Sequence, residues 1–134
     1  MSKEAAQAVV ANDEMLARYV FYSKWIREDK TVRPECFIPP PNLELSVTRH
    51  RGISEAQLWQ IGEQVAQEVQ RPLYGRADVL SQVVRDFKLE PVSSPTENNR
   101  NHVNIVGWPA KKPEQKSYAQ KLAADSAYVP VPQA

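Results

Sequence analysis

Cysteine is scarce in this sequence, and long hydrophobic runs are absent from it. The chain of 134 residues contains one cysteine, Cys36, which excludes an internal disulfide and a multi-cysteine zinc site. No apolar run approaches the roughly 20 residues that a membrane-spanning helix needs, and the first residues lead into no signal-peptide core. We therefore expect a cytoplasmic protein without a metal, a cofactor or a membrane partner.

A strong charge of either sign is missing too. The 17 lysines and arginines nearly balance the 16 aspartates and glutamates, for a formal net charge of +1. This balance argues against a basic nucleic-acid binder of the histone type. The 42% of hydrophobic residues argues against a fully disordered chain, and the length is typical of one soluble domain.

Glycine is rare and proline is frequent, with 4 and 11 residues respectively. The prolines gather in clusters that divide the chain into readable segments. From these divisions we expect a flexible lead over residues 1–12, one domain over 13–125 and an extended tail containing prolines over 126–134.

Apolar residues at steps of three and four predict several helices. The first covers 13–26, although the β-forming residues at 19–22 would also suit a strand. The second covers 54–70, where Ser54 and Gln57 match a capping box at the helix N-terminus.

Two further helices are expected after residue 70. Three strands are also expected, one between the first two helices and two after residue 70. One helix covers 79–87, and the other begins near Pro113, which suits a first helical turn. Alternation of apolar and polar residues predicts strands over 43–48 and 102–106, and a third strand is expected over 89–92.

Irregular chain is expected over 28–42, and an exposed polar loop over 93–101. Helices and strands follow one another without a regular βαβ rhythm. We therefore expect the α+β class, with a small single domain in which three to four helices pack on a short sheet.

His102 is the first candidate for chemistry. It lies among asparagines between the polar loop and an expected strand, so it could act as a general acid or base, oriented by Asn101 or Asn104. Alternatively, its ring binds a loop carbonyl and only shapes the turn. No standard catalytic motif such as GxSxG, HExxH or a phosphate-binding glycine loop is present.

The other histidine, His50, lies between Arg49 and Arg51 at the end of an expected strand. Arginine forks match phosphate oxygens, so these three residues could hold a phosphate, with His50 as a second acid or base. The alternative is a solvated turn.

The segment 18–33 combines basic and aromatic side chains, as single-stranded nucleic-acid binding sites do. The basic candidates are Arg18, Lys24, Arg27 and Arg33, and the aromatic residues among them are Tyr19, Tyr22 and Trp25. On a helix, however, Tyr19 and Tyr22 would face the core and the charges would be ordinary surface residues.

Two other features could contact a protein partner. Trp108 could present an aromatic surface, and the run Pro39, Pro40 and Pro41 could dock in an aromatic groove. The alternatives are a packed corner for Trp108 and a stiff connection for the prolines.

Several short segments resemble a family of small, uncharacterised bacterial proteins. They are Leu16-Ala-Arg-Tyr19, the stretch from Arg33-Pro34 to Phe37-Ile-Pro39, Leu45-Ser-Val47 with Arg49, Ile61-Gly62, Gly75-Arg-Ala77, His102-Val-Asn-Ile-Val-Gly-Trp-Pro109 and the helix from Gln115 to Ala123. The resemblance covers about residues 13–125. It implies a bacterial, cytosolic origin and is compatible with an accessory subunit of a mobile-element or phage-defence operon, but it implies no particular activity.

Three hypotheses for function follow. The first is an accessory subunit that acts through protein–protein interaction, favoured by the missing catalytic motifs and the proline-rich segments. The second is a small enzyme for a phosphate-bearing substrate, RNA or a nucleotide, with the two histidines as acid and base and Arg18, Arg33, Arg49 or Arg51 on the phosphate. The third is a nucleic-acid-binding module. Convergence of His102 with at least two of these arginines in one pocket would favour the enzyme.

Overall fold

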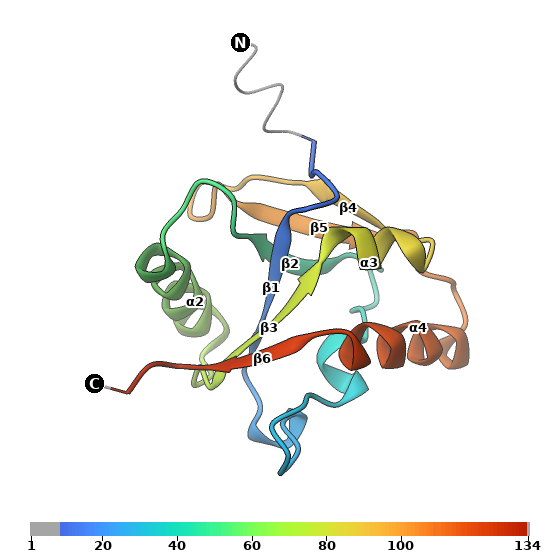
Figure 1. Cartoon of the computed structure of the whole chain (residues 1–134), viewed down its shortest axis with the longest axis horizontal. Coiled ribbons are helices and arrows are strands. Elements are labelled where there is room, and N and C mark those ends of the chain that lie inside the picture. Colours follow the sequence, from blue (N-terminus) through green and yellow to red (C-terminus); the bar gives the residue numbers. More distant parts are fainter. Residues whose placement is uncertain (1–8, 134) are drawn as a thin grey trace.

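Six β-strands form one antiparallel sheet in the computed structural model, which describes residues 9–133 (Figure 1). The strands lie in the order β4-β5-β2-β1-β3-β6. They are β1 (Met15–Val20), β2 (Leu45–Arg49), β3 (Gly75–Leu80), β4 (Glu90–Ser93), β5 (His102–Val106) and β6 (Ala127–Pro130). The helices are α2 (Glu55–Val69), α3 (Ser81–Asp86) and α4 (Lys112–Ala124), and two 3-10 turns are η1 (Ser23–Trp25) and η2 (Pro34–Phe37). The described chain is therefore an α+β domain.

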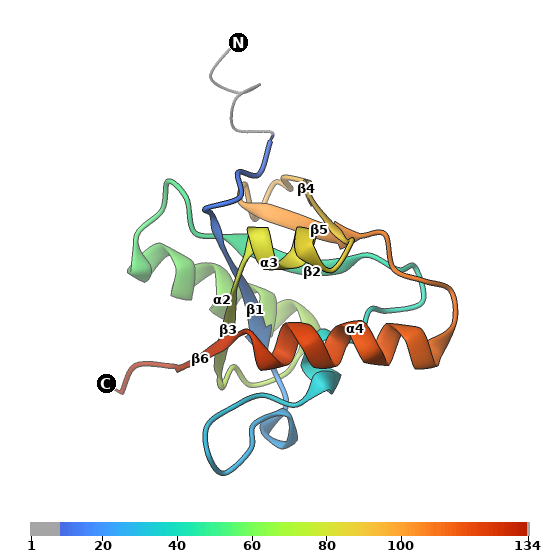
Figure 2. The same ribbon diagram turned by 45° about the vertical axis from the view of Figure 1, so that its right-hand side comes forward.

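The sheet separates two apolar layers, with α2 on one side and α4 on the other (Figure 2). Alternate residues of β1 point into different layers, as the pleat of a strand requires. Leu16 and Val20 belong to the larger core, which includes residues of α3 and α4. Ala17 and Tyr19 pack instead with Leu58 of α2. Both faces of the central strand are thereby buried.

The expected helix over 13–26 is wrong, because β1 occupies its first half. A strand buried on both faces carries apolar residues on both, so it loses the period-two pattern and can match helical spacing by chance. The alternative of a strand at 19–22 is correct for Tyr19 and Val20, which lie in β1, but not for Phe21 and Tyr22, which follow its end. Asn12, just before β1, accepts a hydrogen bond from Nη1 of Arg85 at 2.6 Å.

The expected helix over 79–87 is correct except that it begins two residues later, at Ser81. Val79 lies in β3 opposite Leu16 of β1, and α3 begins directly after the strand at Ser81. The Ser81 hydroxyl is within hydrogen-bond distance of the carbonyls of Ala11 and Glu14, at 2.6 and 2.7 Å. A strand and a helix joined without a loop merge their apolar residues into one run, which hides the boundary.

The other expected elements lie close to their predicted positions, whereas β6, η1 and η2 were not predicted as regular elements and the sheet has six strands rather than the three expected. The capping box of α2 is confirmed, because the Gln57 N–H donates to Ser54 Oγ and the Ser54 N–H donates to Gln57 Oε1. Pro113 lies in the first turn of α4, and β2, β4 and β5 match the three expected strands. The loop over 93–101 is polar, but it is not exposed throughout, since Asn99 is buried.

The expected lead over 1–12 falls mostly outside the described residues. Within its described part, Val10 packs in the larger core and is only 1% exposed. The expected tail over 126–134 contains β6, which pairs with β3 and forms one edge of the sheet. Among residues 9–133, none of the helices combines the length and apolarity that crossing a membrane demands.

Gly62 allows α2 to approach β1 closely, and replacing it should test that contact. A Cβ at position 62 would lie 2.6 Å from the ring of Tyr19, whose hydroxyl donates to the carbonyl of Leu58. Overpacking costs about 1–3 kcal/mol, whereas alanine gains about 1 kcal/mol over glycine inside a helix. We expect Gly62→Ala to lower the free energy of unfolding in urea. In a Tyr19→Leu background the same change should become neutral or stabilising; stabilisation in the parent protein would contradict this packing.

Candidate functional site

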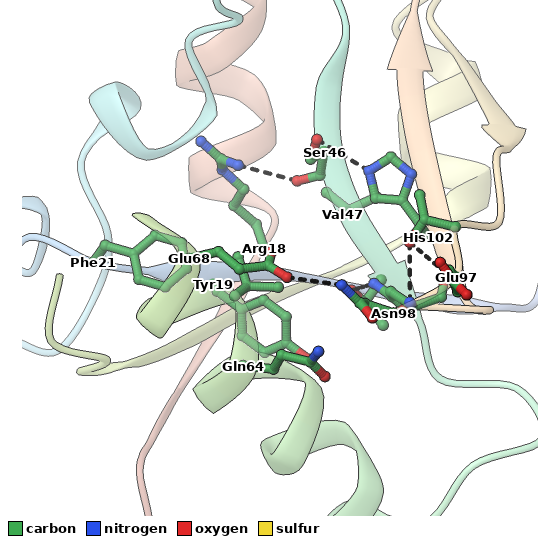
Figure 3. Close-up of a pocket in the computed structure, with 14 residues that line it drawn as sticks. Arg18, Tyr19, Phe21, Ser46, Val47, Gln64, Glu68, Glu97, Asn98 and His102 are labelled. Atoms are coloured by element: carbon green, nitrogen blue, oxygen red, sulfur yellow. Dashed lines mark hydrogen bonds between the residues drawn. The ribbon is translucent and has the colours of Figure 1, made fainter. Parts of the chain in front are cut away.

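β1 and β2 are hydrogen-bonded to each other over a short stretch only, and then the two strands diverge. Leu16 lies opposite Arg49 and Ala17 opposite Thr48, while the rest of β1 pairs only with β3 and the rest of β2 only with β5. A cavity of about 450 Å³ lies at this point, lined by residues of β1, β2, α2 and the loop before β5 (Figure 3). Its size falls within the range of small-molecule sites. We refer to it as the Arg18 pocket.

Arg18 extends from β1 across the gap between the two strands. Its Nε donates to the carbonyl of Cys36 at 2.8 Å, and its Nη1 donates to the carbonyl of Ser46 at 3.0 Å. No carboxylate of residues 9–133 forms an ion pair with this guanidinium. Burial lowers the pKa of Arg18 from its usual value, but an arginine stays charged at neutral pH. The pocket therefore holds a half-buried positive charge with donors to spare.

His102 also lines this pocket, with its ring beside Ser46 (Figure 3), and both of its ring nitrogens have partners. Nδ1 is 2.8 Å from the carbonyl of Ser94, and Nε2 is 3.1 Å from the hydroxyl of Ser46. The expectation that Asn101 or Asn104 orients His102 is therefore wrong. The Asn101 side chain instead donates to the carbonyls of Arg49 and Arg51.

The loop that precedes β5 is tied to the sheet rather than free. The buried Asn99 donates from Nδ2 to the Thr48 hydroxyl at 3.0 Å. Its own N–H donates to the Thr96 hydroxyl at 3.0 Å, and the Asn101 N–H donates to Asn99 Oδ1 at 3.0 Å. These bonds hold the loop in one conformation beside His102, so this wall of the pocket is preformed.

Apolar and acidic groups complete the pocket. Tyr19, Phe21 and Val65 supply an apolar surface, and burial raises the pKa of the Tyr19 hydroxyl well above its usual value. The exposed carboxylates of Glu68 and Glu97 lie among the lining residues, and Asn98 Nδ2 donates to Glu68 at 3.1 Å. The walls therefore combine a cation, an apolar surface and solvent-exposed acceptors.

His50 lies outside this pocket, in a cluster of charged side chains between β3 and α2. Its Nε2 is 3.1 Å from Asp78, and Asp78 also accepts from Arg76 at 3.0 Å. Arg76 donates through both terminal nitrogens to Glu55 of α2, and this bond lowers the Glu55 pKa. The two histidines do not converge on one pocket.

The arginines beside His50 also have structural partners. Arg49 is 5% exposed and donates to both carboxylate oxygens of Glu14, at 2.7 and 2.6 Å. Arg51 donates to the same carboxylate at 3.3 Å. Neither lines the Arg18 pocket, so of the predicted phosphate-binding arginines only Arg18 lies with His102. The convergence of His102 with two of these arginines, which would have favoured the phosphate enzyme, is therefore not found among the described residues.

The basic and aromatic side chains of segment 18–33 divide between core and surface. Tyr19 is buried, whereas Tyr22 and Trp25 are partly exposed, with their ring centroids 4.7 Å apart. Lys24, Arg27 and Arg33 are exposed, and Arg27 donates to the carbonyl of Val32 at 2.9 Å. A second cavity, of about 340 Å³, is lined by Tyr22, Ser23, Lys24, Arg71 and Tyr74. This surface is separate from the lining of the Arg18 pocket.

The candidate partner-binding residues differ in accessibility. Trp108 is 6% exposed and packs in the larger core, with its Nε1 donating to the carbonyl of Ile105 at 2.9 Å. Pro39 is buried as well, whereas Pro40 and Pro41 are exposed. Only these two prolines of the predicted set therefore lie free on the surface.

Cys36 and the described acidic groups form no further reactive centre. Cys36 is fully buried, and this burial raises the pKa of its thiol to about 11. At neutral pH the thiol is therefore protonated and a poor nucleophile. Within residues 9–133 no three side chains of histidine, cysteine, aspartate or glutamate gather in a way that could hold a metal ion.

Sequence reasoning missed Ser46 and the acidic side of the pocket. Ser46 sits on the polar face of an alternating strand, where a serine carries no signal of its own. Its approach to His102 depends on the pairing of β2 with β5, which are more than 50 residues apart along the chain. Glu68, Glu97 and Asn98 read as ordinary surface residues for the same reason.

A scan against protein-family models and searches of the curated proteins and of the solved structures find no match to this chain. The resemblance to small bacterial proteins therefore stays a prediction. The function has to be argued from the Arg18 pocket itself.

Proposed function

We propose that the protein binds a small organic anion in the Arg18 pocket, through a phosphate or carboxylate group. The observation that carries this proposal is the half-buried Arg18 guanidinium, which has no ion pair among residues 9–133 and lines a cavity of about 450 Å³. A desolvated arginine favours a ligand that supplies the missing negative charge, and its fork matches two oxygens of such a group.

The other walls indicate the rest of the ligand. Tyr19, Phe21 and Val65 favour an apolar or aromatic body next to the anionic group. The carboxylates of Glu68 and Glu97 are exposed and accept hydrogen bonds, so they favour a far end that carries N–H or O–H donors. A molecule of nucleotide size with these three parts fits the cavity.

Titration followed by NMR tests this proposal. We expect nucleoside 5′-monophosphates, or aromatic carboxylates of similar size, to shift the amide signals of Arg18, Ser46 and His102, and the uncharged nucleosides to shift them much less. Arg18→Gln should weaken binding at least tenfold, about 1.4 kcal/mol. Arg33→Gln is the matched control, because Arg33 is exposed and does not line the pocket.

Two results would contradict the proposal. In the first, a nucleoside and its monophosphate bind equally well, which would remove the role of the anion. In the second, no member of the panel shifts any pocket residue while the circular dichroism of the protein is native. The accessory-subunit and nucleic-acid hypotheses stay predictions, to be tested on the exposed Pro40 and Pro41 and on the surface around Tyr22.

A further inference from the structure

We propose that Ser46 is a nucleophile and His102 its general base, for hydrolysis of a small ester that carries an anionic group. The inference rests on the proposed function only for the anionic group, which Arg18 would hold. The Ser46–His102 pair stands on its own geometry. No other hydroxyl of residues 9–133 lies within hydrogen-bond distance of a histidine ring nitrogen.

The contacts of His102 define which nitrogen carries the proton. The Ser94 carbonyl can only accept a hydrogen bond, so His102 Nδ1, at 2.8 Å, must be the donor. In the neutral ring Nε2 then has a free lone pair. That lone pair faces the Ser46 hydroxyl at 3.1 Å and can accept its proton. This is the arrangement of a nucleophile, a base and a group that orients the base.

The sheet holds this pair in place. Thr48 lies opposite His102 and Ser46 opposite Asn104, so Ser46 and His102 are diagonal neighbours on one face of β2 and β5. A pair on two bonded strands keeps its geometry better than one on loops. Ser46 is the one exposed residue of β2 and belongs to the pocket lining, so a ligand can reach its hydroxyl.

A comparison within the molecule shows what distinguishes this pair. Ser81 is fully buried, and its hydroxyl faces two carbonyls, so no base can activate it. His50 faces a carboxylate and no hydroxyl or thiol. Among the described residues, His102 is the only histidine whose ring contacts an accessible nucleophile.

Arg18 would orient the substrate at this pair. Its Nη1 donates to the main-chain carbonyl of Ser46 at 3.0 Å, so the guanidinium lies beside the nucleophilic residue. An anion bound by the remaining donors would bring a nearby ester carbonyl towards Ser46 Oγ. Such positioning removes much of the entropic cost of a bimolecular reaction.

The reaction balances without any co-reactant except water. Ser46 Oγ attacks the ester carbonyl carbon while His102 Nε2 takes the hydroxyl proton. The bond to the alcohol oxygen then breaks, and His102 returns the proton to the leaving alcohol. Water next attacks the carbonyl carbon of the acyl-serine and gives a proton to His102 Nε2. The bond between that carbon and Ser46 Oγ then breaks, His102 returns the proton to Oγ, and the carboxylic acid leaves.

A fluorophosphonate, which reacts with activated serine hydroxyls, tests the assignment. We expect the intact protein to gain one phosphonyl group, located on Ser46 by peptide mapping, and Ser46→Ala to abolish this. His102→Gln should slow labelling by about 10²–10⁴-fold with little change in melting temperature. Ser23→Ala and His50→Gln are the matched controls, and both should label at the parent rate.

Hydrolysis of two chromogenic esters tests the substrate class. Mono-p-nitrophenyl glutarate, which keeps a free carboxylate, should be cleaved faster than p-nitrophenyl acetate. Arg18→Gln should remove that preference mainly through KM. Equal rates in every variant would overturn the substrate class.

The failure of this inference is distinguishable from the failure of the proposed function. Absence of labelling, labelling at a residue other than Ser46, or equal labelling of His102→Gln would overturn the Ser46 assignment. If anions still shift the pocket signals in NMR in those cases, the binding function stands without catalysis. If Ser46 is labelled but no anion binds and Arg18→Gln has no effect, the assignment of the reactive pair is confirmed and the proposed anion site is wrong.

Discussion

Replacing Arg49 with methionine should lower the free energy of unfolding by about 3–5 kcal/mol at neutral pH, the loss typical of a broken buried ion pair. The side chain of Glu14 is 2% exposed, and Arg49 donates to both of its oxygens. Without Arg49 the buried carboxylate keeps, among the described residues, the N–H of Ala11 at 2.8 Å and the partly exposed Arg51. Urea unfolding at pH 7 measures the loss.

The loss should depend on pH in a defined direction. Burial alone would raise the pKa of Glu14, but the hydrogen bond from Arg49, with those from Ala11 and the nearby charges, lowers it below its ordinary value of 4.5. A carboxylate with a lowered pKa stabilises the fold above about pH 4.5, and this contribution is lost as the pH falls through the folded-state value. The difference between parent and Arg49→Met should therefore shrink in acid.

A double variant separates the ion pair from other effects of the substitution. Arg49→Met with Glu14→Gln removes both charges, so it should be less destabilised than the sum of the single variants. Additive losses, or a difference between parent and Arg49→Met that does not change between pH 7 and pH 3, would show that the pair is not what Arg49 contributes.

Phe37→Ala should cost about 3–5 kcal/mol, the range for a large aromatic side chain removed from a core. Phe37 is fully buried and is among the largest side chains with almost no exposure. It lies in η2, which packs against α4. Its neighbour Cys36 also provides the carbonyl that accepts from Arg18 Nε, so the variant should weaken anion binding as well as stability.

Phe87→Ala is the control for this prediction. Phe87 is only partly buried at the edge of the same core, so its removal should cost clearly less in urea unfolding. Equal losses for the two variants would mean that η2 is not anchored by Phe37.

Local signals in the sequence were sufficient for the elements with one buried face or a distinct end. The capping box of Ser54 and Gln57 marked the start of α2, and Pro113 marked the first turn of α4. Alternation identified β2 and β5, because one face of each carries polar residues. These patterns depend only on neighbours along the chain.

The central strands could not be identified in the same way. β1 and β3 are buried on both faces, which removes the alternation that identifies a strand. The polar residues of β3, Arg76 and Asp78, are also buried; Arg76 pairs with Asp78 and with Glu55. Whether such a segment becomes a strand is decided by the elements that cover it, and these come from other parts of the sequence.

The same distinction, between features set by local sequence and features set by distant segments, applies to the candidate site. The sequence by itself determined that His102 was a candidate for acid or base chemistry, that α2 would form, and that Cys36 had no cysteine partner within the chain. Only the tertiary structure showed that His50 lies apart from His102 and that Arg49 forms an ion pair with Glu14. It also placed Ser46 beside His102, and Arg18 beside Ser46. The physical reason is that strand pairing between distant segments creates these contacts, and residue type and local spacing carry no record of that pairing.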